Sequence, residues 1–201
     1  MLEKVRTHRL EALLTLAITT GMREGELLAL HWQDMNFEDC SLQVKRAVSY
    51  LKGYGYVESE PKTAKGRRMI KLPVFVVDIL VRHKAQQEEQ RREVGSTWID
   101  KDLVFTNALG YYFSSSTLRK VFRRFLVSIG LPHMRFHDLR HSAATILLAM
   151  KVHPKVVQEI LGHSQIAMTL DVYSHALPSM QEDVTKQWDS EFGKPAKRRR
   201  R

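Results

Sequence analysis

The sequence predicts a mainly helical domain with one small antiparallel β-sheet near its N-terminal end, an α+β fold. The length of 201 residues suits one domain, and apolar residues make up 43% of the chain, enough for a hydrophobic core. Apolar residues recur with helical spacing along most of the sequence. Alternation of apolar and polar residues, which is typical of strands, is confined to residues 36–72. The strands therefore belong to one short region between helices.

The first half of the chain predicts two helices, three strands and a long helix. Leucine spacing predicts a first helix over residues 8–20, which Gly21 ends, and a short second helix over residues 23–31. Within residues 36–72 we expect three short antiparallel strands. Pro73 then begins a long helix, because proline is favoured in a first turn, and the second half of this helix is polar all round.

The second half of the chain predicts further helices. Residues 103–113 are rich in aromatic side chains and contain a glycine, so we expect an irregular segment there. The three serines at 114–116 offer N-caps for a helix that Gly130 and Pro132 end. Further helices are expected over residues 137–150, 154–161, 167–173 and 179–188.

The composition excludes several classes of protein. Cys40 is the only cysteine, which excludes an intrachain disulfide and any metal site built on several cysteines. No apolar run approaches the ~20 residues needed to cross a bilayer, and Met1 is not followed by the apolar segment of a signal peptide. We therefore expect a soluble protein of a reducing, intracellular compartment.

The chain is basic, and much of the excess charge lies at its C-terminal end. Lys and Arg number 32 against 22 Asp and Glu, for a formal net charge of +10. Six of these ten charges lie in residues 194–201, which leaves +4 for residues 1–193. We expect residues 194–201 to be a disordered basic tail that binds phosphate groups or, in a nucleated cell, serves as an import signal. The charge favours nucleic acid as a partner.

Two basic segments in the first half are candidate anion sites. Residues 20–28 place Arg23 at the start of a helix with Glu26 three residues later. This pair is either an ordinary surface ion pair or an anion clamp whose guanidinium is held by Glu26. A basic turn between predicted strands contains Lys62 and Lys65. The turn is either a solvated hairpin or a loop that delivers a lysine to a phosphate, and the spacing does not choose between the two lysines.

Two segments in the second half contain histidines and a tyrosine. His137, Arg140 and His141 share one helical face, so an imidazole and a guanidinium converge. Alternatively, these are ordinary polar residues of a helix N-terminus, or the two histidines form a zinc site, against which the charge of Arg140 argues. His163 fits a helix C-cap and Tyr173 a half-buried core aromatic, or both belong to a functional site.

Taken together, five short motifs resemble the catalytic domain of the tyrosine recombinases, the phage and transposon integrase family. They occur in the order of that family, and the resemblance covers residues 8–188. The motifs are TGMREGELL (20–28), PKT (61–63), HDLRH (137–141), LGHS (161–164) and LDVYSH (170–175). The resemblance implies the tyrosine recombinase catalytic-domain fold.

The resemblance also implies six catalytic residues, all of which are present at the matching positions. The arginine pair would be Arg23 and Arg140, and the two histidines would be His137 and His163. Lys62 would be the lysine of the hairpin, and Tyr173 would be the nucleophile. The supporting residues would be Glu26 and His141, and the residues that face the DNA backbone would be Lys65, Arg67 and Arg68.

The activity and the partners follow from the same resemblance. The enzyme would cut and rejoin DNA strands through a covalent 3′-phosphotyrosyl bond, in site-specific recombination or integration, without a metal, ATP or another cofactor. Its partners would be a double-stranded recombination site and other protomers of itself. It would be a monomer without DNA and a tetramer on DNA, in the cytoplasm of a bacterial or phage-infected cell.

The resemblance further implies a division of the chain. Residues 1–193 would be the catalytic domain and residues 194–201 the basic tail, whereas the N-terminal core-binding and arm-binding domains of full-length members would be absent. The helix expected over residues 179–188 would dock either on its own domain or on a neighbouring protomer.

Three other functions remain open on the sequence. A type IB topoisomerase uses nearly the same residues to relax DNA, although the context of Tyr173 favours an integrase. A basic DNA-binding regulator without catalysis would need a recognition helix, and the sequence does not isolate one. A metal-dependent hydrolase would use His137 and His141 as ligands.

Overall fold

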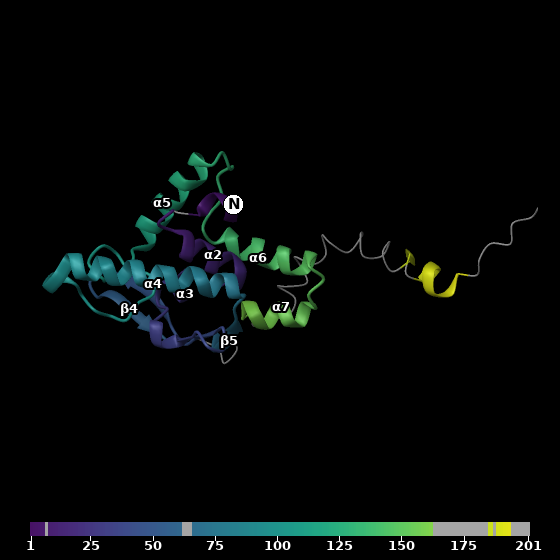
Figure 1. Cartoon of the computed structure of the whole chain (residues 1–201), viewed down its shortest axis with the longest axis horizontal. Helices are drawn as coiled ribbons and strands as arrows, with labels where there is room; N and C mark the ends of the chain where they lie inside the picture. Colours follow the sequence, from purple (N-terminus) through teal and green to yellow (C-terminus); the bar gives the residue numbers. More distant parts are fainter. Residues whose placement is uncertain (7, 62–65, 163–184, 187, 194–201) are drawn as a thin grey trace, which may run out of the picture.

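The computed structural model describes residues 1–6, 8–61, 66–162, 185–186 and 188–193. Within these ranges the chain forms helices and two small antiparallel sheets, which lie along the lower edge of the folded body in Figure 1, and this confirms the predicted α+β class. The helices are α1 (Leu2–Val5), α2 (Glu11–Thr20), α3 (Glu24–Leu28), η1 (Trp32–Asp34), α4 (Val74–Val94), η3 (Gly95–Thr97), α5 (Ser115–Ser128), α6 (Asp138–Ala149) and α7 (Pro154–Leu161). No helix of the described ranges is both long and apolar enough to cross a bilayer.

The strands form two separate sheets, whereas the sequence predicted a single sheet of three strands. Strands β1 (Met35–Asn36), β2 (Ser41–Val44) and β5 (Arg68–Lys71) pair in the order β1-β2-β5. Strands β3 (Ala47–Leu51) and β4 (Gly55–Ser59) pair with each other as a hairpin. The three-stranded sheet therefore has the predicted size, and the hairpin is an addition to it.

Two basic residues between β2 and β3 mark the point where the chain leaves the first sheet. Lys45 Nζ and Arg46 Nη1 lie 3.1 and 2.9 Å from the two carboxylate oxygens of Asp34. The Asp34 side chain is buried, so both basic side chains turn inward to reach it. The chain passes from one sheet to the other at these two residues, which the alternating pattern of the sequence does not reveal.

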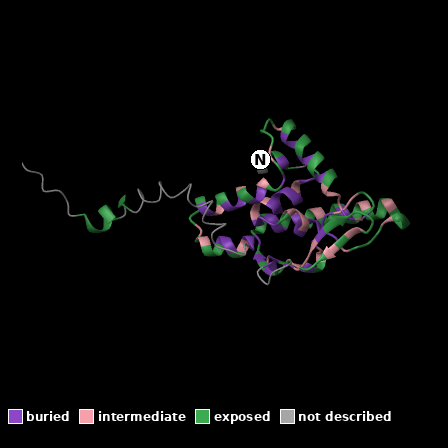
Figure 2. Cartoon of the chain, turned by 180° about the vertical axis from the view of Figure 1, so that it is seen from behind, coloured by how far each residue is buried: buried purple, intermediate pink, exposed green. Residues whose placement is uncertain are grey.

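Helix α2 belongs to the core, where it contacts both α4 and α6. Its apolar side chains are buried, among them Leu13, Leu14 and Leu16. Thr20 is buried as well, and its hydroxyl donates to the Leu16 carbonyl at 2.6 Å, so this polar group is satisfied within the helix. Figure 2 shows the buried residues concentrated in the middle of the folded body.

A second, smaller apolar cluster joins α6 to α7, and α7 also contacts β5 (Figure 1). The buried members of this cluster are Ala143, Ala144, Leu148, Val157 and Leu161. Gly21, at the C-terminal end of α2, packs against the same cluster in the left-handed conformation, with a φ of 60°. The end of α2, the first half of α6 and the end of α7 therefore meet at one place.

Most predicted helices are confirmed, with shifted ends. The first helix begins at Glu11 and not at residue 8, and the second ends at Leu28, because the chain then forms a bridge between His31 and Leu103. Helices α4, α5, α6 and α7 follow the predictions closely. The helix expected over 167–173 lies outside the described residues, and of the helix expected over 179–188 only residues 185, 186 and 188 are described, all helical.

Replacing Gly21 with alanine should destabilise the fold by about 2–4 kcal/mol, because strain and overpacking add. The φ of 60° is unfavourable for alanine, and the new Cβ would lie 2.2 Å from Leu161 Cδ2. Gly53→Ala is the matched control, since Gly53 has a φ of 87° with nothing within 4 Å of a Cβ. We expect a loss of about 1 kcal/mol for the control, from backbone strain alone. Equal losses in urea unfolding would contradict the close packing at Gly21.

Candidate active site

Arg23 and Glu26 form the first part of the site, at the start of α3. Arg23 is the N-cap of this helix and has an extended backbone. The Glu26 carboxylate accepts hydrogen bonds from the Arg23 backbone N–H at 2.9 Å and from Arg23 Nη1 at 2.8 Å. Glu26 is buried, whereas 44% of the Arg23 side chain is exposed. The carboxylate therefore fixes the guanidinium and leaves one side of it open, as the anion-clamp interpretation requires.

Arg140, in the first turn of α6, is buried with an incomplete set of hydrogen bonds. Its Nη1 donates to the Gly21 carbonyl at 2.6 Å, and its Nη2 has no hydrogen-bond partner among the described residues. Burial, and then the positive charge of Arg23, lower the pKa of Arg140 to about 9. A buried cationic N–H group without a partner costs free energy. An anion that accepts a hydrogen bond from Arg140 Nη2 would therefore be stabilised at this position.

The two arginines meet at the junction of three chain segments. Gly21, which accepts from Arg140, is separated from Arg23 by one residue, and Arg23 Nη2 donates to the Gly162 carbonyl at 3.4 Å. Gly162 is the C-cap of α7. The predicted arginine pair is therefore brought together by α2, α6 and the end of α7, although its members are far apart in the sequence.

Glu26 balances the positive charge beneath the arginine pair. Burial alone would raise the pKa of Glu26, but hydrogen bonds and charge from Arg68, followed by the contacts with Arg23, outweigh it and lower the pKa. Arg68 Nη2 lies 2.9 Å from Glu26 Oε2, and both side chains are buried. We expected Arg68 to face the DNA backbone. Its burial against Glu26 corrects that expectation, because the guanidinium points into the protein.

His137 and His141 lie side by side at the start of α6. His137 is the N-cap of the helix, and the centroids of the two imidazole rings are 5.3 Å apart. Burial, followed by the charges of His141 and Arg140, lowers the pKa of His137. A neutral imidazole can accept a proton, so His137 is suited to general-base chemistry. In the described parts of the chain, no group of three His, Cys, Asp or Glu residues could hold a metal ion.

Four predicted site residues, Lys62, Lys65, His163 and Tyr173, lie outside the described residues. Their flanking residues are described. His163 directly follows Gly162, and Lys62 directly follows Pro61. Arg67 is exposed and forms an ion pair with Glu60.

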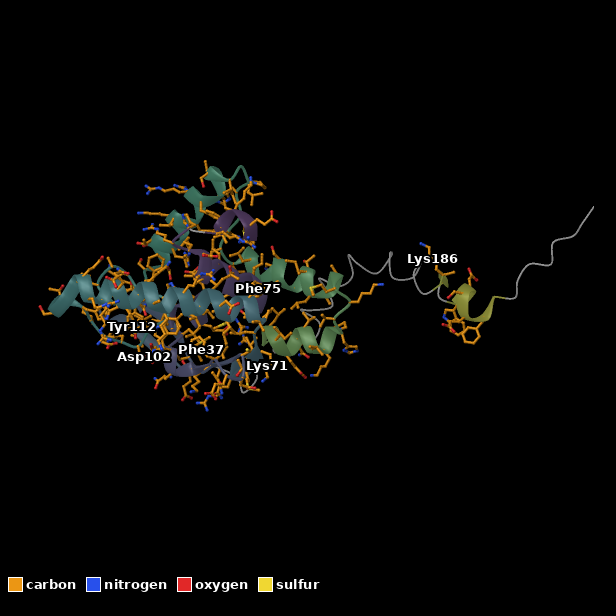
Figure 3. The ribbon with its side chains drawn as sticks, in the orientation of Figure 1. Phe37, Lys71, Phe75, Asp102, Tyr112 and Lys186 are labelled. Atoms are coloured by element: carbon orange, nitrogen blue, oxygen red, sulfur yellow. The ribbon has the colours of Figure 1, made fainter. Side chains whose placement is uncertain are left out.

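The structure reveals a basic face on α5 that sequence reasoning missed. Its side chains are exposed, and Figure 3 shows nitrogen-tipped side chains projecting from this helix. The residues of this α5 basic face are Arg119, Lys120, Arg123 and Arg124. The signal was present in the sequence, because these four residues recur at helical spacing opposite the buried Leu118 and Phe122.

A groove of about 430 Å³ runs beside the α5 basic face and reaches the candidate site. Arg119, Lys120 and Arg123 line one side, and the other side includes Arg135 and His137. Two of these charges are partly balanced, since Arg119 pairs with Glu24 and Arg135 with Asp138. The groove is nevertheless basic overall and leads to His137, which makes it a candidate path for a polyanion.

Comparison with known proteins identifies the family. The sequence profile of the phage integrase family matches residues 1–180. The chain belongs to the phage integrase family. It is similar to a "Tyrosine recombinase XerC-like" protein of Caldanaerobacter subterraneus subsp. tengcongensis, at 36% identity over 92% of this chain and 50% of the relative. It is also similar to the ICEBs1 integrase of Bacillus subtilis, at 30% identity over 87% of this chain and 47% of the relative. The chain spans about half the length of these curated relatives.

Solved structures of integrases and recombinases share the fold. The Tn1549 transposon integrase in complex with transposon right end DNA superposes with a TM-score of 0.79 at 26% identity, over 92% of this chain and 62% of the other. The XerA recombinase superposes with a TM-score of 0.70 at 24% identity, over 90% of this chain and 60% of the other. These similarities confirm the tyrosine recombinase catalytic-domain fold.

Replacing Glu26 with glutamine should lower the free energy of unfolding by about 3–5 kcal/mol at pH 7, because two arginines lose a buried counter-charge. The pKa of Glu26 lies below its ordinary value of 4.5, so its charge stabilises the fold fully above that value. The stabilisation is lost as the pH falls through the folded-state pKa. The difference from wild type should therefore shrink below pH 4.5 in urea titrations.

The control is Glu89→Gln, which removes an exposed partner of Arg92 and should change stability by less than about 1 kcal/mol. A Glu26→Gln variant as stable as this control at pH 7 would show that the buried carboxylate does not hold the site together.

Proposed function

We propose that this chain is a DNA breaking-rejoining enzyme, the catalytic part of a site-specific recombinase that acts through a covalent bond between Tyr173 and DNA. The observation that carries the proposal is the buried, unpartnered Nη2 of Arg140, beside an Arg23 guanidinium that Glu26 restrains. Two guanidinium groups held at one junction of the fold suit a phosphodiester, whose charge grows in the transition state.

The arginine pair would lower the main barrier to attack on DNA. A phosphodiester repels nucleophiles because it is an anion, and its transition state places further charge on the non-bridging oxygens. Arg23 and Arg140 donate several N–H groups in a fixed planar arrangement, so their interaction strengthens as that charge develops. They thereby supply the positive charge that a metal ion supplies in other phosphoryl-transfer enzymes.

The remaining groups would move protons. The Tyr173 oxygen forms a bond to phosphorus while the bond from phosphorus to the 5′ oxygen breaks. A free tyrosine has a pKa of about 10, so its phenol must lose a proton as it attacks, and His137 would accept it. Lys62 would give a proton to the departing 5′ oxygen, and His163 would donate to a non-bridging oxygen. The phosphotyrosyl bond conserves the energy of the broken bond, so rejoining needs no ATP.

The proposed substrate is double-stranded DNA, bound along the α5 basic face and the groove beside it. One of the similar structures named above is an integrase solved with transposon right end DNA. A second similar structure, with a TM-score of 0.61 to this chain, is the XerH recombinase bound to a palindromic difH substrate. By similarity we propose DNA-dependent assembly of several protomers, with four in the active complex, and a cytoplasmic location. Residues 1–193 would form the catalytic domain and residues 194–201 a basic arm.

Replacing Tyr173 with phenylalanine should abolish covalent capture of DNA while changing DNA affinity by less than about threefold, since only the nucleophilic oxygen is lost. The probe is a pool of nicked DNA duplexes of random sequence, from which adducts are recovered under denaturing conditions. Mass spectrometry of the wild-type adduct should place the DNA on Tyr173. Capture by the variant at the wild-type rate, or an adduct on another residue, would refute the assignment.

Replacing Arg123 with glutamine should weaken DNA binding through the loss of a phosphate contact. The slope of log binding constant against log salt concentration should become less steep by about 1. Arg92→Gln is the control, because Arg92 is exposed near the end of α4 and pairs with Glu89. It should leave the slope unchanged. Identical slopes for wild type and Arg123→Gln would exclude the α5 basic face from the DNA interface.

A further inference from the structure

We infer that Arg68 is a positioning residue for strand cleavage, an inference that rests on the function proposed above. Its guanidinium joins three parts of the chain: the residues that flank Lys62, the residues that precede His163, and the carboxylate that holds Arg23. Among the described residues, the hydrogen-bond partners of its guanidinium are Glu26, Gly66 and Ile160, which lie next to the proposed reacting groups in the sequence or the fold. Arg68 fixes the places from which the chain presents these groups.

Every nitrogen of the Arg68 guanidinium has a specific partner. Nε donates to the Ile160 carbonyl at 2.7 Å, and Nη2 donates to Glu26 Oε2 at 2.9 Å. Nη1 donates to the Gly66 carbonyl at 3.2 Å and to Glu26 Oε1 at 3.4 Å. Only 7% of the side chain is exposed. One buried cation therefore links α3, α7 and the chain that leads into β5.

The contact with Gly66 fixes one end of the segment that contains Lys62. A Cβ added to Gly66 would lie 2.4 Å from the Cβ of Pro61, so these two residues are packed tightly together. They flank residues 62–65 on either side. Because Arg68 holds Gly66, it also restrains Pro61, the residue directly before Lys62.

The contact with Ile160 fixes the end of α7. The last carbonyls of a helix have no partner within the helix and carry partial negative charge, so a guanidinium there is favourable. A Cβ added to Gly162 would lie 2.8 Å from Arg68 Nη1, which shows how closely the backbone packs on the cation. The Gly162 carbonyl in turn accepts from Arg23. Gly162 is thus held between two arginines directly before His163.

Only arginine can make this set of contacts. Its donors are spread over a rigid plane, whereas lysine has one point of charge and cannot reach three carbonyl and carboxylate partners in different directions. Arg68→Lys keeps a positive charge near Glu26 but releases Gly66 or Ile160. We expect the released groups to shift by about 1 Å, which is enough to slow a positioned reaction by about 100-fold.

The test compares two leaving groups in single-turnover cleavage at saturating DNA. The probe is the nicked duplex recovered with the wild-type chain in the adduct experiment, made either with the natural 5′ oxygen or with sulfur at that bridging position. A thiolate leaves without a proton, so it does not need Lys62. Arg68→Lys should bind both duplexes with an affinity within about threefold of wild type. It should cleave the oxygen duplex about 10- to 100-fold more slowly than wild type. The fold reduction in its cleavage rate should be at least threefold smaller on the sulfur duplex, by about the contribution of Lys62.

Arg46→Lys is the matched control, because Arg46 is a half-buried arginine that binds Asp34 away from this junction. It should retain the wild-type ratio of oxygen to sulfur cleavage. Arg68→Gln provides a second variant, and all rates are compared below the unfolding midpoint of each protein. Loss of rate only in proportion to the folded fraction, or an equal loss on both duplexes, would overturn the positioning role. Failure of the wild-type chain to form any adduct would instead overturn the proposed function.

Discussion

The Glu26 carboxylate, buried between Arg23 and Arg68, is the interaction on which the arrangement depends. The two oxygens of this carboxylate accept from the Arg23 backbone N–H and from the guanidinium groups of Arg23 and Arg68. Glu26 thereby connects the partly exposed Arg23 to the buried Arg68. A buried ion pair of this kind adds little net stability, since desolvation offsets much of the attraction. Its effect is mainly to fix the geometry. Removing the carboxylate would leave the buried Arg68 guanidinium without a counter-charge.

The two arginines of the candidate site are held in different ways, and the difference suits the roles proposed for them. Arg23 is restrained by an acid and remains partly exposed, so it can meet a ligand without losing its support. Arg140 is buried, bound to a backbone carbonyl, and short of a partner at Nη2. One guanidinium is therefore pre-oriented, and the other keeps an unpartnered donor that an anion would satisfy. Both conditions favour binding that strengthens with the charge on the ligand.

Much of this could be predicted from the sequence, for identifiable reasons. Arg23 and Glu26, and likewise His137 and Arg140, are neighbours on single helical turns, and local spacing reveals such pairs. The role of Arg68 could not be predicted, because its partners Glu26 and Ile160 are distant in the sequence and only folding brings them together. The separate β3–β4 hairpin was missed because alternation predicts strands but not which strands pair with each other. The helical spacing of its basic residues indicates the α5 basic face, but this face lies outside the five motifs and was therefore missed.

The contacts that define the site close some of the longest loops in the chain. Arg140 reaches a carbonyl 119 positions earlier in the sequence, and Arg23 reaches one 139 positions later. Closing such long loops costs conformational entropy, and each contact needs both of its segments to be present. A nascent chain emerging from the ribosome has therefore not assembled its arginine pair until α7 has been synthesised and packed. If the chain cleaves DNA as proposed, partly synthesised copies would lack the complete arginine pair that cleavage requires.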